Sequence, residues 1–143
     1  MNRRTLTFAL AGKPRGKGRP RFTNRGGYVK TYTDADTVAY EGGIARVARQ
    51  ALAGAPPLTG PLAAFVRVCV GVPASASKKA QAAMLAGETY PTKVPDLDNI
   101  IKGVLDGCNK VAFADDKQIV DLHSTKRYGA EPGVTVTLTE LAA

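Results

Sequence analysis

Four aspartates near the middle of the chain have the residue type and spacing of a site for a divalent cation. Asp96 and Asp98 stand at the start of an apolar segment with helical periodicity, and Asp115 and Asp116 follow its end. Mg²⁺ and Mn²⁺ are hard ions that prefer oxygen ligands and keep several waters. Lys102, one turn after Asp98, adds a cation that could contact a phosphate. Together these residue types predict metal-dependent hydrolysis of a phosphodiester.

The first two aspartates also have a purely structural interpretation. Asp96 follows a proline, so its carboxylate is expected to accept a hydrogen bond from an amide of the first helical turn. Asp98 interacts favourably with the helix dipole, and each effect stabilises a helix by roughly 0.5 to 2 kcal/mol. Helix capping does not account for Lys102 or for the second acidic pair, yet the spacing alone leaves both interpretations open.

A basic segment, residues 11–30, combines lysines and arginines with glycine and proline. Because the net charge is +8, a polyanionic partner is expected, with nucleic acid as the first candidate. Glycine lets the backbone approach phosphates, and the cations displace counterions from DNA. The predicted DNA-binding residues are Lys13, Arg15, Lys17, Arg19, Arg21, Arg25 and Lys30, together with Lys126 near the C-terminus. A solvated surface loop is the alternative.

Hydrophobic periodicity predicts the elements that must position these residues. Alternating apolar residues predict strands over residues 3–10, 66–72, 118–128 and 133–140, with 28–33 as a short strand or hairpin arm. Helical spacing predicts helices over residues 34–53, 77–85 and from Asp96 to Cys108. In the last of these, one apolar stripe is expected, with polar residues and Gly103 on the other side; the stripe consists of Leu97, Ile101, Val104, Leu105 and Cys108. Thr33 and Asp36 have the spacing of a capping box for the first helix. The remainder of residues 11–27 is expected to be loop.

This order of elements predicts one two-layer α+β domain over residues 1–143, with a mixed sheet packed against helices and the strand at 66–72 in a central position. No apolar run is long enough to cross a bilayer, and the N-terminus lacks a signal peptide pattern, so we expect an intracellular protein without a membrane partner. Cys69 and Cys108 are expected to be buried free thiols, with one disulfide as the alternative.

The acidic run reads D-x-D-N-x-x-K-x-x-x-D from Asp96 to Asp106, followed by an apolar stretch and D-D-x-x-I. It resembles the signature of the RusA-type Holliday junction resolvases, many of which come from phages and prophages. The segments GKGRPRFT, YTDADTVAYE, SKKAQAAMLAGE and KRYG resemble one branch of that family. The resemblance covers most of the chain, and it implies a RusA-like fold.

The resemblance also implies roles for the acidic residues. Asp96, Asp98 and Asp116 match the metal-binding aspartates of the family, and Lys102 matches its catalytic lysine. Asp115 matches as well, and the spacing leaves the choice between Asp115 and Asp116 open, with Asp116 preferred. The implied cofactor is Mg²⁺, with Mn²⁺ as a substitute and no small-molecule cofactor.

By the same resemblance, the expected activity is an endodeoxyribonuclease that resolves four-way DNA junctions by paired cleavage. The expected working unit is a homodimer in the cytoplasm of a bacterial or phage-infected bacterial cell. Two alternatives stay open. One is a nuclease for simpler branched or single-stranded DNA, and the other is a DNA-binding protein without catalysis.

Overall fold

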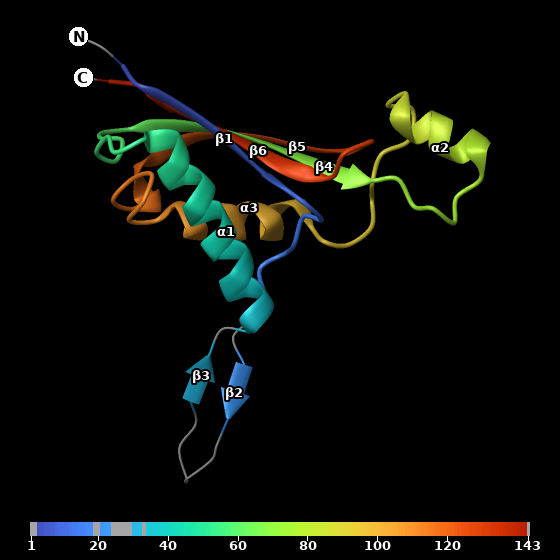
Figure 1. The fold of residues 1–143 in the computed structure, drawn as a ribbon, viewed down its shortest axis with the longest axis horizontal. Helices are drawn as coiled ribbons and strands as arrows, with labels where there is room; N and C mark the ends of the chain where they lie inside the picture. Colours follow the sequence, from blue (N-terminus) through green and yellow to red (C-terminus); the bar gives the residue numbers. More distant parts are fainter. Residues whose placement is uncertain (1–2, 19–20, 24–29, 33, 143) are drawn as a thin grey trace.

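The computed structural model describes residues 3–18, 21–23, 30–32 and 34–142. Its main sheet has four strands in the order β1-β6-β4-β5, in which β4 and β5 are parallel and the other neighbours antiparallel. The strands are β1 Thr5–Ala11, β4 Leu62–Gly71, β5 Ile119–Gly129 and β6 Gly133–Glu140. Helices α1 (Ala35–Leu52) and α3 (Leu97–Cys108) lie on one face of this sheet (Figure 1). The predicted α+β fold with a mixed sheet is confirmed.

Two smaller elements project from this body. The antiparallel hairpin of β2 (Arg21–Thr23) and β3 (Lys30–Tyr32) extends beyond the N-terminal end of α1, and α2 (Lys78–Leu85) lies beyond one end of the sheet (Figure 1). Strand β2 falls within the predicted loop, since its three residues give too short a pattern to recognise. No described helix combines the length and apolar character needed to cross a membrane.

The alternating valines place β4 inside the sheet, as predicted. Val66 and Val68 point into the core, where they stand opposite Val136 and Val134 of β6, while the threonines of β6 alternate toward the other face. Strands β5 and β6 follow each other in the chain, but β4 lies between them. The sheet therefore gains its central strand from the middle of the sequence.

The N-cap residue of α1 lies one position later than predicted from the capping-box spacing. Asp34 is the N-cap residue, and its carboxylate accepts from Thr37 N at 2.8 Å and from the Thr37 hydroxyl at 3.0 Å. Thr33 lies outside the described residues. Asp34 is an equally good N-cap type, so the pattern alone could not separate the two positions.

Helix α3 packs against α1 at very short range. A Cβ atom on Gly107 would lie 2.8 Å from Ile44 Cβ and 2.9 Å from Glu41 O, so only glycine permits this contact. Val104 and Cys108 of α3 are fully buried beside it. The predicted apolar stripe of α3 is thus confirmed, and its burial fixes how the helix is rotated.

The chain segment Gly16 to Gly18 crosses the other side of α3. Lys17 N donates to Asn99 O at 3.2 Å, and Asn99 Nδ2 donates back to Lys17 O at 3.0 Å. Lys17 therefore covers Gly103, which is buried although it was expected on the polar side of the helix. Gly18 N donates to the Thr37 hydroxyl at 2.8 Å, so this part of the basic segment joins the starts of both helices.

Both cysteines are free thiols, so the disulfide alternative is wrong. Cys108 is buried, and burial raises the pKa of its thiol to about 12. Cys69 is only partly buried. We therefore expect Cys108 to act as a small apolar core residue.

A buried carboxylate joins the two ends of the chain. Glu140, only 7% exposed, accepts from Arg4 N at 2.9 Å and from Thr59 N at 2.8 Å. These backbone N–H groups lower the pKa of the Glu140 carboxyl, and the Arg4 guanidinium 3.6 Å away acts in the same direction. The charged form is therefore the one that stabilises the fold.

We predict that Glu140→Gln lowers the free energy of unfolding by about 1 to 3 kcal/mol at pH 7, because two amides lose a charged acceptor. A carboxyl group whose pKa is lower in the folded than in the unfolded state stabilises the fold at pH values above its unfolded-state pKa. This contribution is lost as the pH falls through the folded-state pKa. Urea unfolding at pH 7 and at strongly acidic pH should show the difference shrink. Glu131→Gln, at an exposed position, is the control. A difference that stays constant with pH would contradict the assignment.

Candidate active site

The start of α3 carries a carboxylate that the helix does not use. Asp96 is the N-cap residue with extended backbone angles, but its side chain makes no capping hydrogen bond. The predicted bond to a first-turn amide is therefore wrong. The Asp96 side chain is exposed and makes no hydrogen bond or ion pair with any described residue. Helix capping thus leaves this carboxylate unexplained.

One side of α3 presents three charged residues at successive turns. Asp98, Lys102 and Asp106 are spaced four residues apart, so they lie along the same side of the helix. Asp98 is exposed, and its Oδ1 accepts only from Asn99 N at 2.9 Å. Lys102 is exposed and has no ion-pair partner among the described residues, whereas Asp106 is bound by Lys17. Two of the three charges are therefore available to a ligand.

The second acidic pair lies at the short 3-10 helix η2, Asp116–Gln118, which leads into β5. Asp115 is its N-cap residue and accepts from Lys117 N at 2.9 Å. The Gln118 side chain completes a capping box by accepting from Asp115 N at 3.1 Å, and it also donates to Gly60 O at 3.0 Å. Asp115 thus has a clear structural function, while the exposed Asp116 carboxylate caps nothing.

Negative charge is concentrated where η2 meets α3. Partial desolvation, the Asp115 carboxylate and the charge of Asp106 raise the pKa of Asp116. The hydrogen bond from Lys117 N and the interaction with Asp116 lower the pKa of Asp115. Carboxylates that repel each other in this way favour a bound cation, because the cation offsets their charge.

The carboxylates do not form one preassembled ligand set. Within the described ranges, no three histidine, cysteine or acidic side chains stand close enough to hold a metal ion together. Asp116 lies near Asp115 and Asp106, whereas Asp96 and Asp98 stand at the start of α3. The donor chemistry nevertheless fits Mg²⁺, because this ion is usually held by one or two carboxylates together with waters and substrate phosphates.

The predicted DNA-binding residues fall into different environments. Lys13 and Arg15 are exposed beside a cavity of about 340 Å³, which reaches Pro95 just before α3. Arg15 makes an exposed ion pair with Asp36 at 3.8 Å. Arg21 and Lys30 lie in the β2 and β3 strands, and Arg19 and Arg25 lie outside the described residues. Lys13 and Arg15 therefore border the start of the acidic helix.

Lys17 is occupied within the fold. Its ammonium contacts the Asp106 carboxylate and lies 3.2 Å from Glu41 Oε2. Burial lowers the pKa of Lys17, but the hydrogen bonds to Asp106 and Glu41 outweigh it, and the net shift is upward. Lys17 is thus charged, and its ammonium forms ion pairs with two carboxylates of the protein.

Lys126 is also occupied. Its Nζ donates to Lys93 O at 2.9 Å and to Pro95 O at 3.0 Å, in the loop that leads into α3. No sequence pattern predicts these contacts, because a lysine that binds backbone carbonyls cannot be distinguished by pattern from a lysine that binds phosphate.

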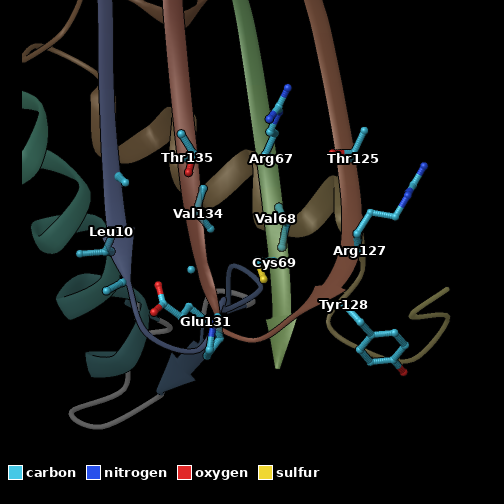
Figure 2. A pocket seen from close by; sticks show the side chains of 14 residues that line it. Leu10, Arg67, Val68, Cys69, Thr125, Arg127, Tyr128, Glu131, Val134 and Thr135 are labelled. Atoms are coloured by element: carbon cyan, nitrogen blue, oxygen red, sulfur yellow. The ribbon is translucent and has the colours of Figure 1, made fainter. Parts of the chain in front are cut away.

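A larger cavity lies apart from all of these residues. It measures about 620 Å³ and lies at the end of the sheet where β4 finishes, lined in part by Arg67, Cys69, Arg127 and Glu131 (Figure 2). None of the candidate carboxylates borders it. The candidate site is therefore formed by the charged groups around α3 and not by this cavity.

Comparisons with known proteins show the family of this chain. The sequence matches the family described as endodeoxyribonuclease RusA over residues 11–139, a region that contains every candidate carboxylate, Lys102 and the whole basic segment. It is also similar to a protein of Bacillus subtilis (strain 168) named "Uncharacterized protein YqaN", with 36% identity over 140 residues, or 96% of this chain and 98% of that protein. The chain belongs to the RusA family of endodeoxyribonucleases.

Proposed function

We propose that this protein is a metal-dependent endodeoxyribonuclease that resolves four-way DNA junctions by paired phosphodiester cleavage. The observation that carries the proposal is the start of α3. There, the Asp96 carboxylate is not used for capping, and Asp98 has one oxygen without a hydrogen bond among the described residues. One turn further, Lys102 presents an exposed ammonium that has no ion-pair partner in the described part of the chain. Family membership supports nuclease chemistry on DNA.

In this proposal Asp96, Asp98 and Asp116 hold Mg²⁺, and Mn²⁺ substitutes for it. The bound ion supplies Lewis-acid polarisation of the phosphate and activation of a water. Lys102 contacts the scissile phosphate and offsets the charge that develops on its oxygens. Asp115 holds η2 in place, which supports the choice of Asp116 as the ligand.

Two other functions compete with this proposal. A DNA-binding protein without catalysis gains nothing from exposed carboxylates, because they repel the phosphates that its basic segment attracts. A nuclease for simpler branched or single-stranded DNA shares the metal chemistry and differs only in substrate. Cleavage of a four-way junction, a flap and a linear duplex in parallel separates these possibilities.

We predict that Asp96→Asn, Asp98→Asn or Asp116→Asn abolishes cleavage of a four-way junction in Mg²⁺ or Mn²⁺, because each removes a charged ligand. Junction binding in EDTA should stay equal or tighten, since a charge facing phosphate is lost. Lys102→Met should lower turnover on the order of 100-fold. Asp121→Asn, an exposed aspartate on β5, is the charge-matched control. Full cleavage by the Asp98→Asn protein would overturn the metal assignment.

We predict different behaviour for two lysines of the basic segment. Lys13→Ala should weaken junction binding and reduce the salt slope by about one unit, because a phosphate contact is lost. Lys17→Met should leave the salt slope unchanged and lower the melting temperature, because Asp106 and Glu41 lose their shared cation. Binding titrations at several salt concentrations and thermal unfolding test both variants. An unchanged slope for Lys13→Ala would remove this residue from the interface.

We predict that the working unit is a symmetric homodimer, because two strands of like polarity must be cut and one chain supplies one set of carboxylates. Mixing wild-type protein with the Asp98→Asn variant should give heterodimers that nick a supercoiled cruciform plasmid. Wild-type protein alone should linearise it. Paired cuts by a complex that sediments with one protein copy per junction would refute the dimer.

A further inference from the structure

The loop that leads into α3 is held by a charged side chain from the neighbouring strand. Lys126 projects from β5 on the helix side of the sheet, and its ammonium donates to the carbonyls of Lys93 and Pro95 at 2.9 and 3.0 Å. Lys126 is partly buried and has no carboxylate partner among the described residues. The ammonium therefore binds two backbone carbonyls of one loop.

The loop has little other anchorage at this point. Val94 is 86% exposed, and Lys93 is exposed as well, so apolar burial contributes little to their placement. Further upstream, the Arg127 guanidinium lies 4.8 Å from the centroid of the Tyr90 ring. The two adjacent residues of β5, Lys126 and Arg127, thus hold the same returning loop at two places.

The Pro95 carbonyl belongs to the same planar peptide unit as the nitrogen and Cα of Asp96. Fixing this oxygen therefore fixes the plane that ends at the Asp96 Cα. Asp96 O then accepts from Ile100 N at 3.0 Å, which is the first hydrogen bond of α3. The carbonyl that Lys126 binds thus belongs to the residue directly before Asp96, a candidate metal ligand.

We propose that Lys126 is a positioning residue that fixes Asp96 for metal binding. The proposal rests on the proposed function, in which Asp96 is a ligand of Mg²⁺. Two of the three ammonium donors are already engaged, so Lys126 acts on the metal site through the backbone and is not a main contact for phosphate. Outer contacts of this kind typically change metal affinity by 10- to 100-fold when they are removed.

The test compares Lys126→Met with Lys93→Met. Both variants remove one positive charge from the same surface, but Lys93→Met keeps the carbonyl that Lys126 binds. Lys126→Arg keeps a charged donor and should restore most of the wild-type behaviour. Lys126→Gln, which keeps one neutral donor, is a milder variant should Lys126→Met fold poorly.

The first measurement needs neither metal nor DNA. In the metal-free protein, Lys126→Met should speed hydrogen exchange of the Ile100 amide relative to the amides of the last turn of α3, and Lys93→Met should not. This result tests the anchoring of Asp96 even if the protein proves to have another function. Unchanged exchange at Ile100 would overturn the positioning role.

The second set of measurements tests the link to the metal. With Lys126→Met, the Mn²⁺ affinity measured by titration of the protein alone should fall on the order of 10-fold. The Mg²⁺ concentration for half-maximal cleavage should rise by a similar factor, while junction affinity and salt slope in EDTA stay unchanged. A lower salt slope with unchanged Mn²⁺ affinity would instead make Lys126 a phosphate contact and refute the proposal. Failure of wild-type protein to cleave DNA would count against the proposed function alone.

Discussion

Ile100, Val104 and Cys108 of α3 are fully buried, and Gly107 brings the helix into contact with α1. These contacts fix the rotation of α3 about its axis, because any other rotation would expose apolar side chains or create a clash at Gly107. The opposite side of the helix is then determined by its period of 3.6 residues. Asp98 and Lys102 point away from the core for this reason, and among the described residues the only side-chain hydrogen bond of either is the one that Asp98 accepts from Asn99 N.

Charge balance around α3 explains why a basic protein carries an uncompensated acidic site. Lys17 pairs with Asp106 and Glu41 inside the fold, where an unpaired charge would be costly. Asp96 and Asp116 have no such partner among the described residues. In the proposed function, the excess of cations elsewhere in the chain would attract DNA toward this site, and a bound metal ion would offset the charge of the carboxylates that face its phosphates.

The sheet and the long helices were predictable because their patterns are periodic and local. The valines of β4 and the apolar stripe of α3 each follow from burial of one face, and both were found as expected. The prediction that Gly103 lies on the polar side of α3 was wrong, because its burial depends on Lys17, a residue 86 positions earlier in the chain. A contact of that kind leaves no periodic signal in either segment.

The limit of sequence-based prediction is clearest for lysine, because its ammonium can bind phosphate, carboxylate or a backbone carbonyl. Lys13 is exposed, Lys17 binds two carboxylates and Lys126 binds two carbonyls, yet the sequence predicted one role for all three. The structure links these roles, because Lys17 belongs to the basic segment and also contacts α3. In the proposed function, phosphate bound at Lys13 would act on a segment whose backbone is hydrogen-bonded to Asn99, one residue from Asp98. DNA contact and the position of the acidic helix would then be connected through the backbone of residues 13–17 and the two hydrogen bonds between Lys17 and Asn99.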